Sequence, residues 1–251
     1  MKKLLLILLV VYSVHTDAQQ FITSGTIEFE SRKAVRKAMD YGDEDDSFWK
    51  DLVSKLPQFT TNYFTYTFAN NQSVYKFARN TDVQKLPTWF QENYDDDVYF
   101  NDYGNGKFLK RIAVRNDDTY LVEGTPPKME WKISPNENMV IAGFNCRKAS
   151  TVLFDSVYVF AYYTDEIAIS GGPMNFNGLP GMILGITVPR LYTSWVATTV
   201  SLGKGNTTIV PPAKGKKITE PKLQEIFLGF RKNWGKDQQK YINPTYWRTF
   251  L

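Results

Sequence analysis

The sequence predicts a mainly β protein: a strongly curved antiparallel meander sheet, shaped like half of a barrel, with a few amphipathic helices packed on it. Aromatic residues make up 15% of the chain. Many of them recur at every second position, which is the spacing of a half-buried strand. Short turn sequences separate these alternating segments, which implies antiparallel neighbours. About ten strands joined in this way cannot form a flat sheet, because each strand is twisted.

The clearest strand signal is a hairpin over residues 62–78. The sequence YFTYTF (63–68) places Phe64, Tyr66 and Phe68 on one face, and NNQS (70–73) is a turn before VYKFA (74–78) returns. A strand is also expected at 26–30. The remaining predicted strands are 98–103, 107–114, 119–123, 131–133, 139–150, 157–164, 182–188 and 192–200, with turns at 104–106, 115–118 and 154–156.

Two segments have helical rather than strand spacing. Ser47 is a suitable N-cap for a helix over 48–56, which Pro57 ends. Thr219 can cap a second helix over 220–234, followed by Gly235 as its C-terminal cap. Apolar residues follow helical spacing in this second segment, at Leu223, Ile226, Phe227, Phe230 and Trp234.

The first 18 residues have the composition of a secretory signal peptide. Lys2 and Lys3 precede an apolar run over 4–12, and small residues lie before the expected cut. The run is shorter than the roughly 20 residues that span a bilayer. We therefore expect removal of residues 1–18, no transmembrane segment in the mature chain, a single β-rich domain over 19–251, and a periplasmic or secreted location.

Cleavage at this site would remove His15, the single histidine of the chain. The mature protein would then lack the base of Ser-His-Asp or Cys-His catalysis and the ligands of common zinc sites. Cys146 is the single cysteine, so no intrachain disulfide is expected. With apolar neighbours and no histidine to activate it, Cys146 is expected to be a small buried side chain rather than a reactive thiol. We assign no catalytic residue, no metal site and no cofactor.

The formal charge of +4 is spread along the chain, apart from short runs at 43–46 (DEDD), 95–97 (DDD) and 214–217 (KGKK). Short runs of this kind are usually solvated loops, and we predict that for all three. The acidic runs lack the ligand order of an EF-hand, although another kind of calcium site stays open there. A nucleic-acid partner is not expected, because no concentrated basic segment is present.

The segment GLPG (178–181) predicts a sharp corner. Leu179, Pro180, Gly181 and Met182 fit a type II turn, in which proline presets the second position and glycine supplies the positive φ of the third. Gly178 allows close approach of neighbouring backbone. The alternative, a ligand-contacting loop, remains open.

The segment GPMNFNGLPGMILGI (172–186) resembles the signature of the GLPGLI family, a group of secreted proteins of Gram-negative bacteria. Similar family segments are GTIEFE (25–30), WKI (131–133), IAGFNCRKA (141–149) and AYYTDEI (161–167). Met182 stands where the family name has leucine, a change that a core tolerates. The resemblance implies an envelope location and a β-rich fold, and it implies no activity and no catalytic residue.

The leading functional hypothesis is a non-catalytic binding or accessory protein of the cell envelope. It would hold a small apolar or peptide ligand, or dock on an envelope or outer-membrane complex. Aromatic stripes of a curved sheet can line a ligand cavity, and Phe64, Tyr66, Tyr158 and Phe160 are the candidate lining residues. The same stripes also fit an ordinary core. The alternative function is a carboxylate-dependent hydrolase of envelope glycans, which needs two facing carboxylates.

Overall fold

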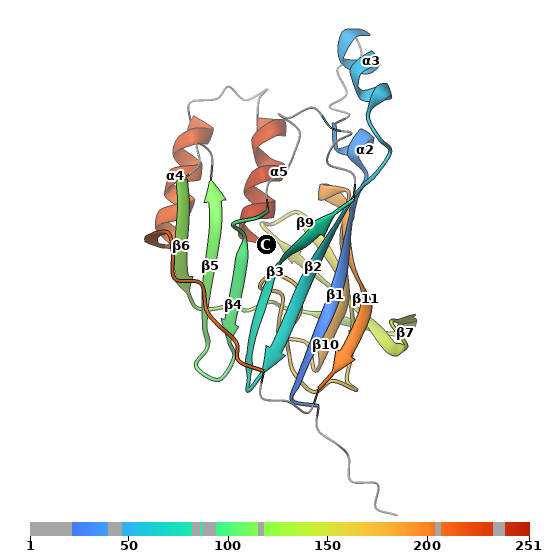
Figure 1. Ribbon diagram of the computed structural model, residues 1–251. Coiled ribbons are helices and arrows are strands. Elements are labelled where there is room, and N and C mark those ends of the chain that lie inside the picture. Colours follow the sequence, from blue (N-terminus) through green and yellow to red (C-terminus); the bar gives the residue numbers. More distant parts are fainter. Residues whose placement is uncertain are drawn as a thin grey trace, which may run out of the picture.

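The computed structural model describes residues 22–39, 47–81, 86, 94–114, 118–203, 207–232 and 239–251. The predicted signal peptide (1–18), the acidic run 43–46 and most of the turn at 115–118 lie outside these ranges. Within them, twelve strands form one open, curved sheet with helices beside it, which confirms the predicted fold class (Figure 1). None of the described helices is both long and apolar enough to cross a bilayer.

The strands are β1 (Ser24–Lys33), β2 (Thr60–Ala69), β3 (Gln72–Asn80), β4 (Val98–Asp102), β5 (Lys107–Val114), β6 (Asp118–Gly124), β7 (Lys132–Ile141), β8 (Phe144–Leu153), β9 (Val157–Thr164), β10 (Met182–Val188), β11 (Thr193–Leu202) and β12 (Lys216–Thr219). Their order in the sheet is β12-β6-β5-β4-β3-β2-β1-β11-β10-β9-β8-β7. Two antiparallel meanders, β1–β6 and β7–β11, are therefore joined where β1 pairs with β11.

The prediction of a purely antiparallel sheet is wrong at one edge. β12 pairs with β6 in parallel, with Lys216 opposite Tyr120. The predicted loop at 214–217 is therefore a strand in its second half, although Lys216 and Lys217 are exposed as expected. The chain reaches this edge from β11, which lies far across the sheet, and a parallel neighbour needs such a crossover.

Two-residue turns with positive φ set the hairpins. Asn70 and Asn71 have φ of 51° and 59° between β2 and β3, as their sequence predicts. Ala142 and Gly143, with φ of 50° and 88°, join β7 to β8. The predicted single strand over 139–150 is therefore wrong, because this tight turn divides it into two paired strands.

Large side chains cover the inner face of the first meander. Strand register places one row across β1 to β6, made of Ile27, Tyr66, Tyr75, Tyr99, Lys110 and Val122. All six are buried. Phe64 lies beside this row, with its ring stacked 5.0 Å from that of Tyr75.

The second meander carries smaller side chains on its inner face, including Ala149, Val159 and Ala161. The space in front of them is filled by residues 165–181, which connect β9 to β10 and are called the inserted loop below. Its large buried apolar side chains are Ile167, Met174, Phe176 and Leu179. Asn101 Nδ2 donates to the Met174 carbonyl (3.2 Å), and Trp131 Nε1 donates to the Asn177 carbonyl (2.8 Å).

The helices are α2 (Val35–Met39), α3 (Ser47–Lys55), α4 (Glu220–Lys232), α5 (Gln239–Phe250) and the 3₁₀ turn η3 (Pro189–Leu191). Helices α3 and α4 were predicted, and Phe48 of α3 is 75% exposed. Helix α5 was not predicted, since it contains Pro244. It lies beside α4, and its C-terminal end reaches the inner face of the sheet (Figure 1). There Lys110 Nζ donates to the Thr249 carbonyl at 2.6 Å.

Candidate functional site

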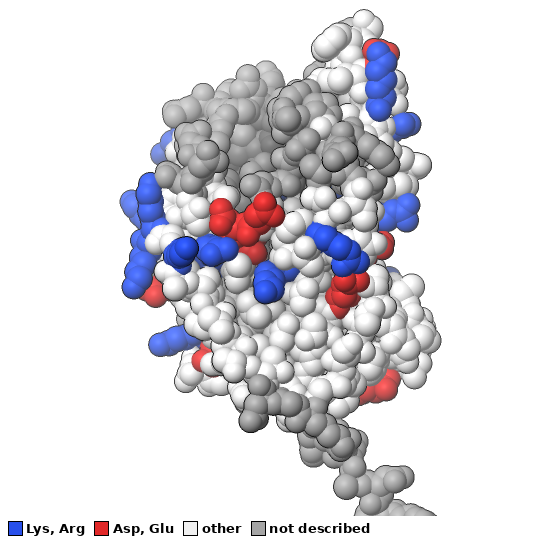
Figure 2. Space-filling model, in the orientation of Figure 1, with Lys and Arg blue, Asp and Glu red and all other residues white. Residues whose placement is uncertain are grey.

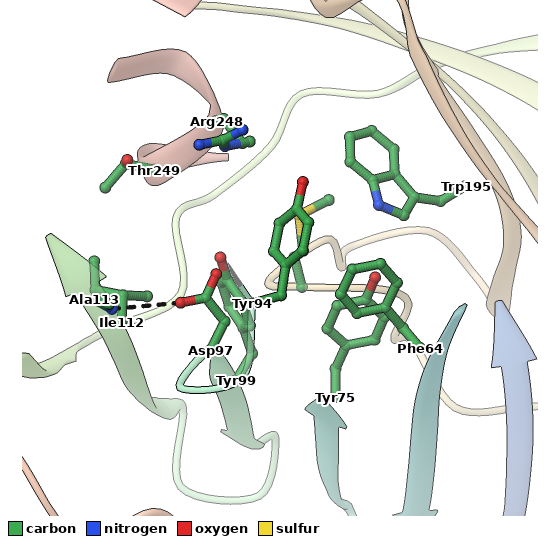
Figure 3. Close-up of a pocket in the computed structure, with 11 residues that line it drawn as sticks. Phe64, Tyr75, Tyr94, Asp97, Tyr99, Ile112, Ala113, Trp195, Arg248 and Thr249 are labelled. Carbon is green, nitrogen blue, oxygen red and sulfur yellow. Dashed lines mark hydrogen bonds between the residues drawn. The ribbon is translucent and has the colours of Figure 1, made fainter. Parts of the chain in front are cut away.

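A partly open cavity of about 70 Å³ lies where the first meander, the inserted loop and α5 meet (Figure 3). Five aromatic rings, one carboxylate and one guanidinium contribute to its wall. The lining residues are Phe64, Tyr75, Tyr94, Asp97, Tyr99, Ile112, Ala113, Met174, Trp195, Arg248 and Thr249. Strands β2, β3, β4, β5 and β11 supply most of them, so the curvature of the sheet creates the site.

Asp97 is the carboxylate of this wall. It precedes β4 by one residue, and it accepts a long hydrogen bond from the Ala113 backbone N–H (3.4 Å). Burial raises the pKa of Asp97 to about 7, against the smaller opposing effects of the Ala113 hydrogen bond and the Lys110 charge. The prediction of a solvated loop at 95–97 holds for the exposed Asp95, whereas the side chain of Asp97 is half-buried beside the tyrosines.

Tyr75 contributes a hydroxyl group that has no hydrogen-bond partner within the described part of the chain. The residue is only 2% exposed, and burial raises its pKa well above the usual value for tyrosine. Figure 3 shows its ring alongside Phe64, with the hydroxyl end directed toward Trp195. A buried hydroxyl without a partner is costly, so this position is unusual in a folded protein.

Two cations lie against the aromatic wall. Lys110 Nζ is 5.6 Å from the centre of the Tyr99 ring, and the Arg248 guanidinium carbon is 5.9 Å from the centre of the Tyr94 ring. Burial lowers the pKa of Lys110 to about 8 and that of Arg248 to about 10. Lys33, whose pKa burial lowers to about 7, is affected by the nearby charge of Arg248. Three basic groups therefore lie around the cavity, and Arg248 is the one whose pKa stays well above neutral pH.

The four predicted lining residues do not come together. Phe64 lines the cavity, whereas Tyr66 is buried beside it and shares a hydrogen bond with the Tyr103 hydroxyl (3.0 Å). Tyr158 and Phe160 are on the opposite, outer face of β9, where Tyr158 is 56% exposed. Period-two spacing identifies the two faces of a strand but does not show which one lies inside.

The GLPG segment forms a corner of a different type from the one predicted. The Gly181 N–H donates to the Leu179 carbonyl (2.8 Å), which closes a three-residue γ-turn around Pro180. The Met182 N–H, which would close a type II turn, instead donates to the Ile167 carbonyl (3.1 Å). Tertiary pairing with the inserted loop therefore decides the turn. Gly178 and Gly181 have positive φ, of 91° and 145°.

Cys146 is buried, and desolvation raises the pKa of its thiol to about 11. The burial of Cys146 is confirmed, and the raised pKa disfavours the thiolate, which is the reactive form. Among the described residues, no group of three or more histidine, cysteine, aspartate or glutamate side chains could hold a metal ion.

The residues of the cavity that were not predicted differ in how visible they are in the sequence. Tyr75 shares the inner face of the predicted hairpin by simple alternation, so its position could have been found. Asp97 is two residues before Tyr99 and so shares its face by the same rule. Arg248 could not have been found, because it lies on a helix that contains a proline.

A protein-family model described as "Protein of unknown function (Porph_ging)", which is the GLPGLI family, matches residues 145–185. The match includes β9, the inserted loop with its GLPG corner, and parts of β8 and β10. It supports the resemblance to this family over a small part of the chain. No curated protein sequence matches the chain.

Among solved structures, PNGF-II in space group P21 matches this chain with a TM-score of 0.51 and 14% sequence identity, and the match covers 81% of this chain and 33% of that one. The C2 form of PNGF-II has a TM-score of 0.48 and 14% sequence identity, and the match covers 80% of this chain and 32% of that one. An uncharacterized conserved protein from Thermus thermophilus has a TM-score of 0.37 and 6% sequence identity, and the match covers 79% of this chain and 91% of that one. At these identities the likeness concerns the fold alone, and the present chain spans about a third of the length of PNGF-II.

Proposed function

We propose that the protein is a non-catalytic binding or accessory protein of the cell envelope, and that it docks on a protein partner rather than carrying a ligand inside the sheet. Removal of residues 1–18 and export of a single domain over 19–251 are parts of this proposal. The observation that carries it is the packing of the inner face, which the described part of the chain fills with its own side chains.

Ligand carriage is disfavoured by volume. Pockets for small molecules typically enclose roughly 300–1,000 Å³. The cavity has about 70 Å³, because the tyrosine row occupies one half of the interior and the inserted loop occupies the other. An interior filled in this way leaves the outer surface for recognition of a partner.

Docking is supported by exposed apolar side chains on the second meander. Tyr158 is 56% exposed and lies directly opposite Val152, which is 46% exposed. The rings of Tyr158 and Phe160 are nearly parallel, 6.4 Å apart, along the outer face of β9. We call Val152, Tyr158 and Phe160 the outer strip. Tyrosine with apolar neighbours is a typical composition for the centre of a protein interface.

A charge beside the outer strip is already paired. Lys148, which lies over the Phe160 ring, forms an ion pair with Glu137. The outer face of β1–β3 also pairs opposite charges, as in Arg79 with Glu28, and Figure 2 shows basic and acidic side chains mixed on the face in view. A locally neutral strip suits an uncharged protein surface better than an anionic membrane.

One observation favours the alternative function, a carboxylate-dependent hydrolase. Asp97 has a pKa near 7 in an aromatic cavity, as a general acid requires. A glycosidase, however, needs a second carboxylate across the cleft. Asp97 is the single acidic residue among the described residues that line the cavity. We therefore place docking first.

The test is crosslinking of the exported protein in envelope extracts, followed by mass spectrometry of what is captured. Tyr158→Asp and Val152→Asp place charge on the outer strip. Leu228→Asp is the matched control, since Leu228 is 44% exposed on α4, away from the strip. We expect one identified envelope protein to be captured by wild type and by Leu228→Asp, and to be lost from both strip variants.

Equal capture by all four proteins would contradict docking through the outer strip. Turnover of envelope glycans that Asp97→Asn abolishes would instead support the hydrolase. A carried ligand would be detected as a stoichiometric small molecule that remains bound to every variant.

A further inference from the structure

The cavity is too small for a carried ligand but large enough for one chemical group. Its volume of about 70 Å³ exceeds the roughly 10–15 Å³ that a single water molecule requires in the same measure. It is well below the roughly 150 Å³ of a cavity that binds benzene. A planar group of three or four non-hydrogen atoms fits between these limits.

Two polar side chains of the cavity wall determine which hydrogen bonds a ligand there would form. The Tyr75 hydroxyl is buried, lines the cavity and lacks a partner within the described residues, so a ligand atom there would satisfy it. Asp97 has one oxygen in a long hydrogen bond to Ala113, and carboxylate oxygens can accept several hydrogen bonds. A ligand that accepts from Tyr75 and donates to Asp97 would use both groups.

Charge restricts the ligand further. A cation would enter a wall where Arg248 already lies over Tyr94 and Lys110 over Tyr99, and both would repel it. An anion would meet the half-buried carboxylate of Asp97 at close range. An uncharged group avoids both costs, and the aromatic rings of Phe64 and Trp195 supply apolar walls for its faces (Figure 3).

We propose that this cavity is a binding site for a small uncharged group that both donates and accepts hydrogen bonds, of which a carboxamide is the simplest, carried at the end of a larger ligand. The carbonyl oxygen accepts from the Tyr75 hydroxyl and the amide N–H donates to Asp97. This site is independent of docking through the outer strip.

Three probes of nearly equal shape show the effect of charge on binding: acetamide is neutral, acetate is an anion and acetamidinium is a cation. Each is titrated into the purified full-length mature chain at pH 8, and the indole N–H resonance of Trp195 is followed by NMR, with Trp195→Phe used to assign it. We expect saturable binding of acetamide with a Kd on the order of millimolar, as for other very small ligands. Acetate and acetamidinium should bind at least about fivefold more weakly.

Tyr75→Phe removes the hydroxyl alone, and Tyr163→Phe is its matched control. Tyr163 is also buried with a hydroxyl that lacks a partner in the described chain, but it does not line the cavity. Tyr75→Phe should weaken acetamide binding about fivefold, and Tyr163→Phe should leave it unchanged. Neither variant loses a hydrogen bond, so both should fold.

Three results would overturn the proposal. The first is the absence of a saturable shift with acetamide, and the second is equal affinity for all three probes. The third is equal weakening by Tyr75→Phe and Tyr163→Phe. None of them bears on capture of a protein partner by the outer strip, so this site and the docking function can fail separately.

Discussion

The two meanders of the sheet fill the same curved interior by different means. In β1–β6 the strands themselves supply large side chains, such as Tyr66, Tyr75 and Tyr99. In β8 and β9 several inner residues are small, such as Ala149 and Ala161, and the inserted loop supplies much of the bulk through Met174 and Phe176. The cavity lies where these two kinds of packing meet, since its wall takes Tyr75 and Tyr99 from one side and Met174 from the other.

This difference indicates what the GLPG segment does. The inserted loop must leave the sheet, fill the interior and return in register as β10 within 17 residues, 165–181. The corner at Pro180 and Gly181 makes the return possible. The residues that resemble the GLPGLI signature therefore stabilise the interior of the second meander, whereas the residues around the cavity come mostly from the first.

Gly181→Val should cause the largest loss of stability. A β-carbon at Gly181 would lie 2.0 Å from the Thr164 carbonyl oxygen, which is impossible without backbone movement. The positive φ of 145° adds about 1–3 kcal/mol of strain for a β-branched residue. We expect little folded protein, measured as secreted yield and melting temperature.

The matched control for this change is Gly178→Ala. Gly178 also has positive φ, but an added β-carbon would approach nothing closer than the Trp131 indole nitrogen at 3.6 Å. Gly178→Ala should lose only about 1 kcal/mol of unfolding free energy, from the backbone conformation that glycine adopts more readily than alanine. Equal stability of the two variants would contradict the close packing of Gly181 against Thr164.

Phe176→Ala tests whether the inserted loop is the core of the second meander. Phe176 is fully buried, and removing its ring should cost about 3–5 kcal/mol of unfolding free energy. The measurement is urea denaturation. Phe48→Ala is the control, because its exposed side chain should contribute less than about 0.5 kcal/mol. A cost below about 1 kcal/mol at Phe176 would show that the loop is not needed for packing.

Lys110→Met should remove an increase in unfolding free energy that the wild type shows at alkaline pH. Lys110 lies in the first meander. Burial lowers the pKa of Lys110 to about 8 in the folded state from 10.5, so above pH 8 the unfolded chain binds more protons. The unfolding free energy then increases with pH, by at most about 1.4 kcal/mol per unit. The difference in melting temperature, wild type minus variant, should grow between pH 7.5 and 9.5 on the order of a few degrees. A constant difference would contradict a buried, charged Lys110.

Asp97→Asn should change stability with the opposite pH dependence. The folded-state pKa of Asp97 is raised from 3.8 to about 7, so between these values the folded chain binds more protons and wild type loses stability as pH rises. The variant avoids this loss. Its melting temperature should exceed that of wild type above about pH 7.5, and the gap should close toward pH 4.

Asp165→Asn is the control for Asp97→Asn. Asp165 carries the same charge, but its side chain is exposed in an ion pair with Arg147. It should show no such gap. If the two variants behave alike, the pH dependence reflects overall charge rather than the cavity.

Local patterns in the sequence predict most of the sheet and little of the site. Alternation over 63–68 and the Asn70-Asn71 turn give the β2–β3 hairpin, because both depend on neighbouring residues. The division of 139–150 at Gly143 was missed, since glycine inside an alternating segment also fits a continuous strand. Three features depend on contacts between distant segments and were not predicted: the position of β12, the turn type at Pro180 and the side of the sheet that faces inward. The partial burial of Asp97 depends on the same long-range packing.

Native mass spectrometry of the protein purified from its own envelope tests the central claim, a filled interior with docking outside, most directly. The account predicts the mass of the processed chain alone once the protein partner has been removed by mild dissociation. A stoichiometric lipid or other apolar molecule that remains bound to the isolated chain would contradict it, because the cavity of about 70 Å³ that the described residues form cannot hold such a ligand.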